Sequence, residues 1–315
     1  FGSPLSTSEA YSFWIELEIY KAILTGDYSS LTTAFEKMEE HIIPSPEQQP
    51  GNNKYNPTSP ASYAAEYEDP NLYPSEIEFS TPVGVDPIAD QLKQEHGTSD
   101  VYGMHWLLDV DNVYKYGNMG DGTSTPSYIN TFQRGEQESV WETIPHPSWE
   151  DFSWGGPNGF IPLFTKDKSY AKQWRYTDAP DADARLVELM YKLIHFLKNQ
   201  QNKDPAIAPL LEKTSKMNDY LRYCLFDKYF KKIGCQDVNA SGQGYDSCHY
   251  LISWYYGWGG STDGDWSWRI GGSHIHFGYQ NVIAALAAKS LNMSEQAQID
   301  WSTSLQRQIE LYKWL

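Results

Sequence analysis

Acidic residues cluster directly before a long apolar helix pattern, in the segment "TDAPDADARL" at 177–186. Asp178, Asp181 and Asp183 all fall within this short stretch, together with Pro180. Aspartates in this place usually cap the helix that follows or complement its dipole. A carboxylate can also take a proton from water as a general base. The spacing alone predicts a helix start and leaves both roles open for each aspartate.

A second carboxylate with the same ambiguity stands near the beginning of the chain, in "STSEAYSFW" at 6–14. Ser6 and Glu9 have the S-x-x-E spacing of a capping box, which predicts that Glu9 returns to the backbone at the helix start. The aromatic residues that follow favour a different role, because a partly apolar cleft would raise the pKa of Glu9 enough for a general acid. Glycoside hydrolysis requires two carboxylates with different roles, and Glu9 and Asp181 are the candidate pair.

Two further groups have side chains that bind metals. The stretch 130–147 concentrates Gln137, Glu138 and Glu142, whose oxygens suit Ca²⁺, although the spacing matches no EF-hand loop and a solvated helix face is the alternative. His274 and His276 lie two positions apart, as a chelating pair on a strand would. No third ligand accompanies them in the sequence, so hydrogen bonding near a ligand or in the core is the favoured interpretation.

Tryptophan is unusually frequent, with 12 residues in the chain, and many lie among glycines and aspartates. The set comprises Trp106, Trp254, Trp258, Trp266 and Trp268. Flat rings beside polar groups suit stacking on a pyranose, because the C–H face of a sugar is apolar while its hydroxyls bind carboxylates and amides. This pattern predicts a carbohydrate-binding surface.

The bulk composition restricts the class of partner. A formal charge of −17 and a pI near 4.8 argue against nucleic acid or an anionic membrane, since both require a basic surface. Three cysteines without a CxxC pair indicate neither a disulfide framework nor a zinc site. The sequence shows no initiator Met, no signal peptide and no apolar run long enough to span a membrane. We therefore expect residues 1–315 to be a fragment of a longer protein.

Apolar periodicity predicts a mainly α-helical chain that forms one domain without an internal boundary. The segment 44–87 and the Gly- and Trp-rich stretches 153–159 and 257–268 are predicted to be loops. Helices joined by such aromatic loops suggest a helical toroid with a binding face at one end. The predicted helices cover about 9–24, 30–42, 86–97, 103–115, 135–143, 182–199, 206–233, 245–257, 276–290 and 294–315.

In these stretches the chain resembles the catalytic domain of glycoside hydrolase family 48. The resemblance follows the chain nearly from end to end, in order, and is far more specific than any short motif. The runs that carry it include "TSEAYSFW", "YGMHWLLDVDN", "SYINTFQRGEQESVWETIPHPSW", "LFTKDKSYAKQWRYTDAPDADAR", "GYDSCHYLISWYYGWGG" and "SHIHFGYQN".

The resemblance implies a fold and an activity. The family's domain is an (α/α)6 barrel about twice as long as this chain, so residues 1–315 would be its N-terminal half. Its members are processive cellulases that act from the reducing end of the chain, by inverting hydrolysis of β-1,4 bonds with release of cellobiose-type products. The resemblance also implies a secreted, extracellular protein whose signal peptide lies outside the fragment. A cellulosome scaffold would be a partner through a module that also lies outside it.

Site residues are carried over by position. Glu9 would be the general acid, and Asp181 would be the base that activates water. Substrate-binding positions are Trp106, Phe132, Trp266 and Trp268. Gln137, Glu138 and Glu142 match the family's calcium-binding stretch, which makes Ca²⁺ a structural ion, while the chemistry requires no cofactor.

The chain also departs from the family pattern. Ser3 stands where the family carries a histidine, and Val113 replaces a tryptophan that follows "DVDN". Such changes leave two alternatives to a cellulase, a chitin-active enzyme and a non-catalytic carbohydrate-binding member. Retention of both Glu9 and Asp181 favours an enzyme, because a binding module has no need for the pair.

Overall fold

The computed structural model describes residues 5–65, 67, 69, 72, 76–132, 144–149, 172–198, 205–272 and 274–315. Within these ranges the chain folds into seven α-helices and two small antiparallel sheets. None of the helices found in the described ranges is both long enough and apolar enough to cross a membrane.

Helices form where the sequence predicts the strongest periodicity and end where the capping residues predict. The first helix, α1, begins behind Thr7, whose hydroxyl accepts the N–H of Ala10, and ends at Gly26 in the left-handed conformation that favours glycine. The apolar stripe expected on α4 is buried. The bounds are α1 Ser8–Thr25, α2 Ser29–His41, α3 Ala89–His96, α4 Pro180–Leu197, α5 Ile207–Tyr220, α6 Val282–Ala287 and α7 Glu295–Trp314.

The sheets were not predicted, so the expectation of an all-α chain is confirmed only for its helices. One sheet has the strand order β1-β2-β3-β4 and the other β5-β6-β7, and all neighbouring strands are antiparallel. The bounds are β1 Leu5–Thr7, β2 Leu107–Asp109, β3 Ser127–Phe132, β4 Ile144–Pro147, β5 Gln173–Asp178, β6 Tyr256–Ser261 and β7 Ser267–Ile270.

Four helix predictions fail in part. The stretch 103–115 contains β2, and 245–257 contains a 3-10 turn at Gly244–Ser247 and the start of β6. The helix expected over 206–233 ends at Tyr220, and that expected over 276–290 is reduced to α6 behind a 3-10 turn at Phe277–Tyr279. The helix expected over 135–143 and the loop at 153–159 lie outside the described residues.

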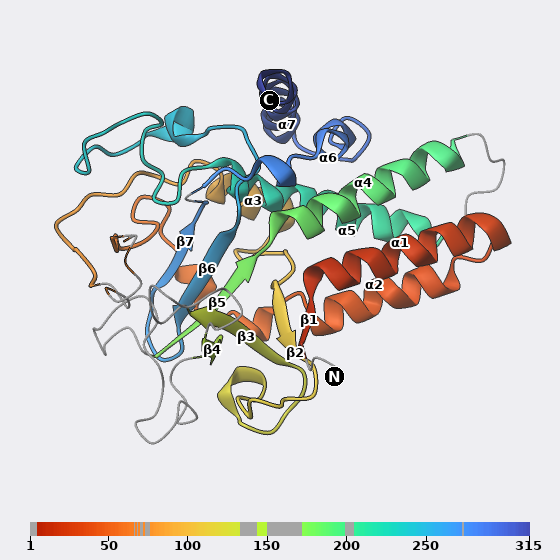
Figure 1. Cartoon of the computed structure of the whole chain (residues 1–315), viewed down its shortest axis with the longest axis horizontal. Helices are drawn as coiled ribbons and strands as arrows, with labels where there is room; N and C mark the ends of the chain where they lie inside the picture. The colour runs from red at the N-terminus through yellow and green to blue at the C-terminus, as the bar shows by residue number, and fades with distance from the viewer. Residues whose placement is uncertain are drawn as a thin grey trace.

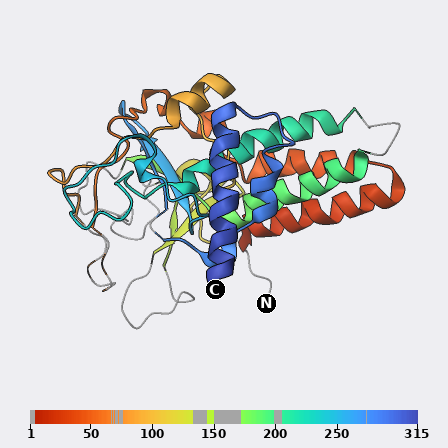
Figure 2. The ribbon, with the colours of Figure 1, turned by 90° about the horizontal axis from the view of Figure 1, so that it is seen from above.

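Helices and sheets occupy opposite ends of the molecule. The pairs α1–α2 and α4–α5 extend together to one side, and the two sheets lie at the other end of these helices (Figure 1). Helix α4 packs against α1, α5 and α6, and α6 packs against α7. Seen from above, α7 crosses the other helices rather than running alongside them (Figure 2). The chain enters α1 from β1 and α4 from β5, so both helix starts lie where the helices meet the sheets.

A buried histidine joins the two sheets at this junction. The Nδ1 atom of His105 accepts the backbone N–H of Thr177 in β5, and Nε2–H donates to the carbonyl of Ile129 in β3. Burial lowers the pKa of His105 to about 4, so the ring is neutral at physiological pH and both hydrogen bonds persist. The ring therefore fixes the end of β5, from which α4 begins.

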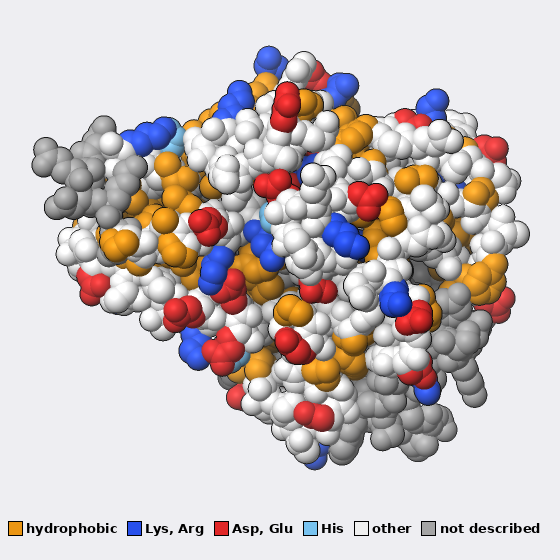
Figure 3. All heavy atoms as spheres, turned by 180° about the vertical axis from the view of Figure 1, so that it is seen from behind, with side chains coloured by type: hydrophobic (Ala, Val, Ile, Leu, Met, Phe, Trp, Pro, Cys, Tyr) orange, Lys and Arg blue, Asp and Glu red, His pale blue; other side chains and the backbone are white. Residues whose placement is uncertain are grey.

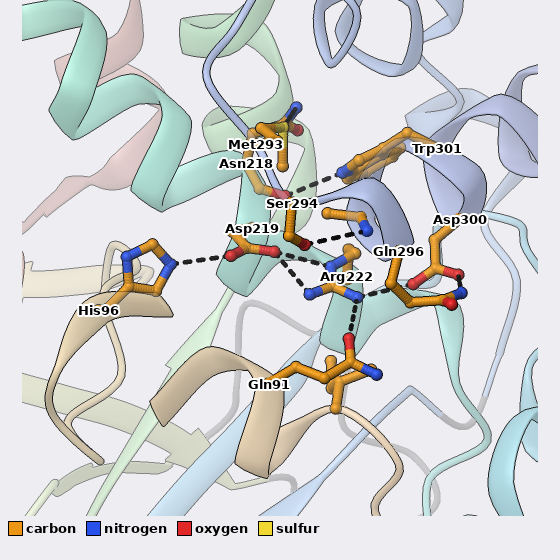
Figure 4. Close-up of polar contacts among 12 residues, drawn as sticks. Gln91, His96, Asn218, Asp219, Arg222, Met293, Ser294, Gln296, Asp300 and Trp301 are labelled. Carbon is orange, nitrogen blue, oxygen red and sulfur yellow. Dashed lines mark hydrogen bonds and ion pairs between the residues drawn. The ribbon is translucent and has the colours of Figure 1, made fainter. Parts of the chain in front are cut away.

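The helices on the far side are tied together by a buried ion cluster around Arg222. The guanidinium of Arg222 pairs with Asp219 on its own segment and with Asp300 on α7, and the ring of His96 on α3 contacts Asp219 (Figure 4). Gln91 on α3 accepts a further hydrogen bond from Arg222. Because every charge has a partner, the cluster orients α3, α5 and α7 without leaving a buried ion unpaired.

Charged side chains elsewhere are dispersed. On the face seen from behind, Lys and Arg side chains lie singly among more numerous Asp and Glu side chains and form no stripe (Figure 3). The face seen in Figure 3 thus carries dispersed charges of both signs.

Candidate active site

Glu9 lies in the first turn of α1, and its side chain faces away from the helix start. Ser6 belongs to β1, so the N-cap is Thr7, and the predicted capping box between Ser6 and Glu9 is wrong. The Glu9 side chain is about half exposed, at 53%, and its Oε1 atom faces Arg185 across the gap between α1 and α4. Glu9 is thus available for chemistry rather than occupied as a cap.

Asp181 stands in the first turn of α4, next to Pro180, which suits a helix start because it lacks an N–H to satisfy. The side chain is 17% exposed. Burial raises the pKa of this carboxyl, the charge of Arg185 opposes the rise, and the negative charge of Glu9 adds to it. A carboxylate with a raised pKa is a stronger base than an exposed aspartate, which suits proton removal from water.

Arg185 brings the two carboxylates together. Its Nη2 atom lies 3.4 Å from Oε1 of Glu9 and 3.6 Å from Oδ2 of Asp181. The two oxygens can be no farther apart than the sum of these distances. This limit admits both the roughly 5–5.5 Å of retaining glycosidases and the lower end of the roughly 6.5–9.5 Å range of inverting ones. The carboxylates predicted from distant parts of the sequence are therefore neighbours.

The position of Arg185 is itself fixed from α1. Its Nη1 atom donates a 2.9 Å hydrogen bond to the hydroxyl of Ser12, and the guanidinium lies 4.4 Å from the centre of the Phe13 ring. Ser12 in turn donates to the backbone carbonyl of Glu9. Arg185 was not among the predicted site residues, although its i, i+4 spacing from Asp181 was a sequence signal for a contact.

A cavity of about 690 Å³ reaches Asp178 and Ala179, just before Asp181 in the chain, although neither Glu9 nor Asp181 is among the residues that line it. Its lining includes four tryptophans. The predicted residues Trp106, Trp266 and Trp268 line it together with Trp254. Two of the rings are held by amides, since the indole N–H of Trp106 donates to Asn130 and that of Trp268 donates to Gln173. Rings fixed in this way offer flat apolar surfaces of the kind that stack on sugars.

Other predicted aromatic and metal-binding residues have different outcomes. Trp258 is fully buried in the core and does not line the cavity, so its assignment to a sugar-binding surface is wrong. Phe132 ends β3, but its side chain lies outside the described part. Gln137, Glu138 and Glu142 also lie outside the described residues, as does Ser3. Val113 is 55% exposed and does not line the cavity.

The His274–His276 pair does not form a metal site in the described structure. No group of three His, Cys, Asp or Glu side chains gathers as metal ligands anywhere in the described ranges. His276 instead stacks on Tyr279, with ring centres 4.1 Å apart, and its ring meets Trp254 edge-on. The favoured interpretation was hydrogen bonding near a ligand or in the core. The His276 ring packs against two residues that line the cavity, but its Nδ1 atom has no hydrogen-bond partner in the described structure.

Tyr279 connects the cavity to the carboxylates and was missed in the sequence. It lines the cavity, and besides burial the negative charges of Asp181 and Glu9 raise the pKa of its hydroxyl. Its hydroxyl therefore remains protonated and lies within the electrostatic reach of both carboxylates. The sequence around it, "HFGYQN", contributes only to the resemblance, because no spacing rule distinguishes a tyrosine of a functional site from a tyrosine of the core.

Asp178 and Asp183 flank the helix start that the spacing predicts, but they neither cap it nor lie in solvent. Asp178 is the last residue of β5, Asp183 lies within α4, and both are fully buried. No side chain caps α4. The prediction fails because the residues before α4 belong to a buried strand rather than to an exposed loop.

Comparison with known proteins identifies close relatives over almost the whole chain. Residues 3–315 match the model of Glycosyl hydrolase family 48. The chain is 52% identical over 99% of its length to cellulose 1,4-beta-cellobiosidase (reducing end) CelS of Acetivibrio thermocellus, of which it covers 42%. It is 51% identical over 98% of its length to exoglucanase B of Cellulomonas fimi, covering 30% of that protein. The chain is also 50% identical over 99% of its length to exoglucanase-2 of Thermoclostridium stercorarium, and it covers 34% of that protein.

The chain thus spans less than half the length of these relatives. The family match covers both helix starts that hold the carboxylates and the tryptophans that line the cavity.

Proposed function

Because this chain belongs to glycosyl hydrolase family 48, we propose that the protein hydrolyses β-1,4-glycosidic bonds of cellulose. The observation that carries this proposal is the pair Glu9 and Asp181, joined by Arg185, together with a cavity whose lining includes four tryptophans. The names of the relatives, exoglucanase and cellobiosidase acting at the reducing end, support processive action from a chain end with release of cellobiose-type products.

The two carboxylates take different roles in this reaction. Glu9, which is half exposed, protonates the glycosidic oxygen of the leaving group, and Asp181 removes a proton from the attacking water. Water attacks from the face opposite to the leaving group, so the anomeric configuration is inverted. Burial supports the role of Asp181, because it raises the pKa of the carboxyl and makes the ionised form a stronger base.

Substrate recognition rests on the aromatic walls and their amide partners. Trp106, Trp266 and Trp268, which line the cavity, stack on pyranose rings of the polysaccharide. Phe132 is a further substrate-binding position. The remainder of the domain is a second set of helices that completes an (α/α)6 barrel with α1, α2 and α4 to α7. In the complete barrel the cavity becomes part of a tunnel through which the polysaccharide chain is threaded.

The same proposal covers the parts of the protein beyond the site. It acts outside the cell, where cellulose is found, and attaches to a cellulosome scaffold through a module outside residues 1–315. Gln137, Glu138 and Glu142 bind a structural Ca²⁺, which takes no part in the chemistry. Elemental analysis of the purified full-length protein before and after chelation tests this ion.

An anomeric assay of the full-length protein tests the reaction. We expect cellobiose to appear first as its α-anomer by NMR when amorphous cellulose is the substrate, and Asp181→Asn to lower kcat by about 10²- to 10⁴-fold. Asp237→Asn, an exposed substitution in a loop far along the chain from either carboxylate, serves as the matched control.

Chitin is offered in parallel. Sugar release from chitin alone would show that the substrate is chitin rather than cellulose. Release from neither polymer by the unmutated protein would leave only a carbohydrate-binding role.

A further inference from the structure

Two buried aspartates flank the proposed base in both sequence and space. Asp178 ends β5, Asp183 lies in the first turns of α4, and Asp181 stands between them. Both side chains have 0% exposure. Neither takes part in the reaction described above, and neither caps the helix.

The surroundings of this pair contain no compensating cation. Within the described part of the chain no ion pair joins Asp178 or Asp183 to a Lys or Arg side chain; Arg185 pairs instead with Asp181 and Glu9. The backbone N–H of Met104 lies 3.4 Å from Oδ2 of Asp183 and donates to it. Neither carboxyl oxygen of Asp178 accepts a hydrogen bond of good geometry. Two ions in this place would be costly, because a buried charge without partners is strongly disfavoured.

The groups that face the pair are neutral or negative. Tyr256 is the cross-strand partner of Asp178, and burial raises the pKa of its hydroxyl well above the usual value. Burial does the same to the thiol of Cys224 on the neighbouring 3-10 turn. The remaining charged neighbour is Asp181, whose negative charge disfavours ionisation of both buried carboxyls.

The space around Asp178 leaves little freedom for its carboxyl. A methyl group added to Gly103 would lie 2.3 Å from the hydroxyl of Tyr256 and 2.8 Å from Oδ2 of Asp178. The Gly103 backbone therefore approaches both groups closely. The carboxyl is thereby held at the point where β5 turns into α4. The two carboxyl groups interact with each other across this turn, and in the described structure Oδ1 and Oδ2 of Asp178 and Oδ1 of Asp183 have no hydrogen-bond partner. A hydrogen bond between the two groups would give these buried oxygens a partner. Such a bond requires a proton on one of the two carboxyl groups.

We propose that Asp178 and Asp183 share one proton and that this carboxyl pair positions Asp181. Asp178 is the protonated member and donates to Asp183, which also accepts the N–H of Met104. The pair fixes the turn that aims Asp181 at the attacking water. Because two ionised carboxylates would raise the pKa of Asp181 further, the shared proton also keeps Asp181 ionised. The positioning role rests on the proposed function, whereas the shared proton does not.

Replacement of one member by its amide tests the proposal in the full-length protein. In Asp178→Asn an N–H donor takes the place of the shared proton, so we expect kcat on amorphous cellulose to stay within about threefold of the wild type. In Asp178→Ala the link is lost, and we expect kcat to fall at least about tenfold with KM little changed, since the tryptophans still hold the substrate. Asp183→Asn is expected to behave like Asp178→Asn. Asp237→Asn is the control.

Two readouts do not depend on catalysis. The infrared spectrum at neutral pH is expected to show a protonated carboxyl band that Asp178→Asn lacks. Burial raises the pKa of the pair in the folded protein. The wild type should therefore lose stability as the pH rises through the pKa of the folded protein. Over the same pH range, the melting temperature of Asp178→Asn should fall less than that of the wild type.

The absence of a protonated carboxyl band in the infrared spectrum of the wild type would contradict the proposal that the two aspartates share a proton. A loss of kcat in Asp178→Asn as large as in Asp178→Ala, or an undiminished kcat in Asp178→Ala, would overturn the positioning role. Should Asp178→Ala fail to fold, the kcat values of Asp178→Asn and Asp183→Asn decide. If the wild type releases no sugar from any polymer, the proposed function fails, and the band still decides whether the pair holds a proton.

Discussion

Arg185 places one positive charge between two carboxylates that need opposite protonation states for catalysis. An acid must hold its proton until the glycosidic bond breaks, while a base must already be ionised. The guanidinium stabilises the ionised form of Asp181 against the effect of burial. Its hydrogen bond to Ser12 and its contact with Phe13 keep this charge close to α1. The residue thus couples the two helix starts electrostatically as well as geometrically.

Removal of this charge should change the pH dependence of the reaction. We expect Arg185→Met to raise the pKa of Asp181, because burial and the charge of Glu9 then act without opposition. The acidic limb of kcat/KM, where the base becomes protonated, should move to higher pH. Arg185→Lys keeps the charge but not the forked geometry, so its shift should be smaller. Lys192→Met on the same helix is the control, and a profile identical to the wild type in Arg185→Met would contradict the expectation.

At the residue scale, sequence reasoning paired Glu9 with Asp181 more successfully than it described the burial of the acidic residues nearby. Glu9 and Asp181 were selected through a resemblance, and the structure brings them together. The capping box at Glu9 and a capping role for Asp178 and Asp183 were inferred from local spacing and are wrong. Local spacing cannot show that β5 runs into α4 with both faces covered, and burial is what changes these aspartates from helix-start residues into a buried pair.

Strand β6 explains how glycines in an aromatic sequence build the cavity wall. The segment "YGWGGS" is buried along its whole length and lies between β5 and β7. A methyl group added to Gly259 would lie 2.6 Å from the carbonyl oxygen of Trp174 and 2.6 Å from the ring of Trp268. The absence of a side chain at Gly259 therefore lets the Trp268 ring lie flat against the strand.

Gly259→Ala should displace the Trp268 ring and weaken binding of soluble cello-oligosaccharides by about tenfold, since a lost stacking contact is worth about 1 kcal/mol or more. Isothermal titration with the catalytically impaired Asp181→Asn protein measures this. Gly257→Ala on the same strand adds a methyl group at ordinary contact distances of 3.4 Å and above, so its effect should be smaller. Equal losses in the two variants would argue against a specific role for Gly259.

Several of the strands that sequence reasoning missed are short and almost completely buried. In β5 the buried residues are nearly continuous, so the alternation that reveals a half-exposed strand is absent. In 103–115 the residues Met104, Leu107 and Leu108 have helical spacing by coincidence, and all three are buried around a strand. Helices with long apolar stripes, such as α4, were predicted within about two residues of their observed bounds.

The Arg222 cluster should dominate the stability of the packing between α3, α5 and α7. Arg222 is fully buried, and its removal would leave Asp219 and Asp300 as uncompensated charges (Figure 4). We expect Arg222→Met to lower the free energy of unfolding of the full-length protein by about 3–5 kcal/mol, measured with urea. Arg307→Met removes an exposed ion pair with Glu310 and should lower the free energy of unfolding far less. Similar costs for the two substitutions would show that the cluster is not stabilising.

The pH dependence of this cluster follows from Asp219. Although burial opposes ionisation, hydrogen bonding to His96 and the charge of Arg222 lower the pKa of Asp219 below its usual value. A carboxyl whose pKa is lower in the folded protein than in the unfolded chain contributes stability above the pKa of the unfolded chain. This contribution is lost as the pH falls through the pKa of the folded protein. The difference in stability between wild type and Arg222→Met should therefore shrink in acid.

The molecule as a whole exposes apolar surface on its helices. On α1 the exposed set is Phe13, Trp14, Leu17, Tyr20 and Leu24, with Leu24 at 85% exposure. On α7 it includes Ile299, Ile309, Tyr312 and Trp314. Apolar side chains are also visible on the helical side of the rear face (Figure 3). Helices that are apolar on two faces belong inside a larger helical assembly, in agreement with the proposed barrel.

This surface predicts how residues 1–315 behave when expressed without the rest of the protein. Contiguous apolar faces of this kind drive association in water, so we expect the isolated segment to form aggregates or soluble oligomers and to be inactive on cellulose. Light scattering coupled to size-exclusion chromatography measures the state. The double substitution Leu17→Glu and Leu24→Glu should reduce self-association of the segment, because it places charges on the α1 face, whereas Val238→Glu in an exposed loop should not.

In the full-length protein the same double substitution should lower the melting temperature, since there the α1 face packs against the completing helices. A segment that is monomeric, unfolds cooperatively and is indifferent to these charges would show that α1 faces solvent in the complete protein too, and the proposed barrel would then have to be abandoned.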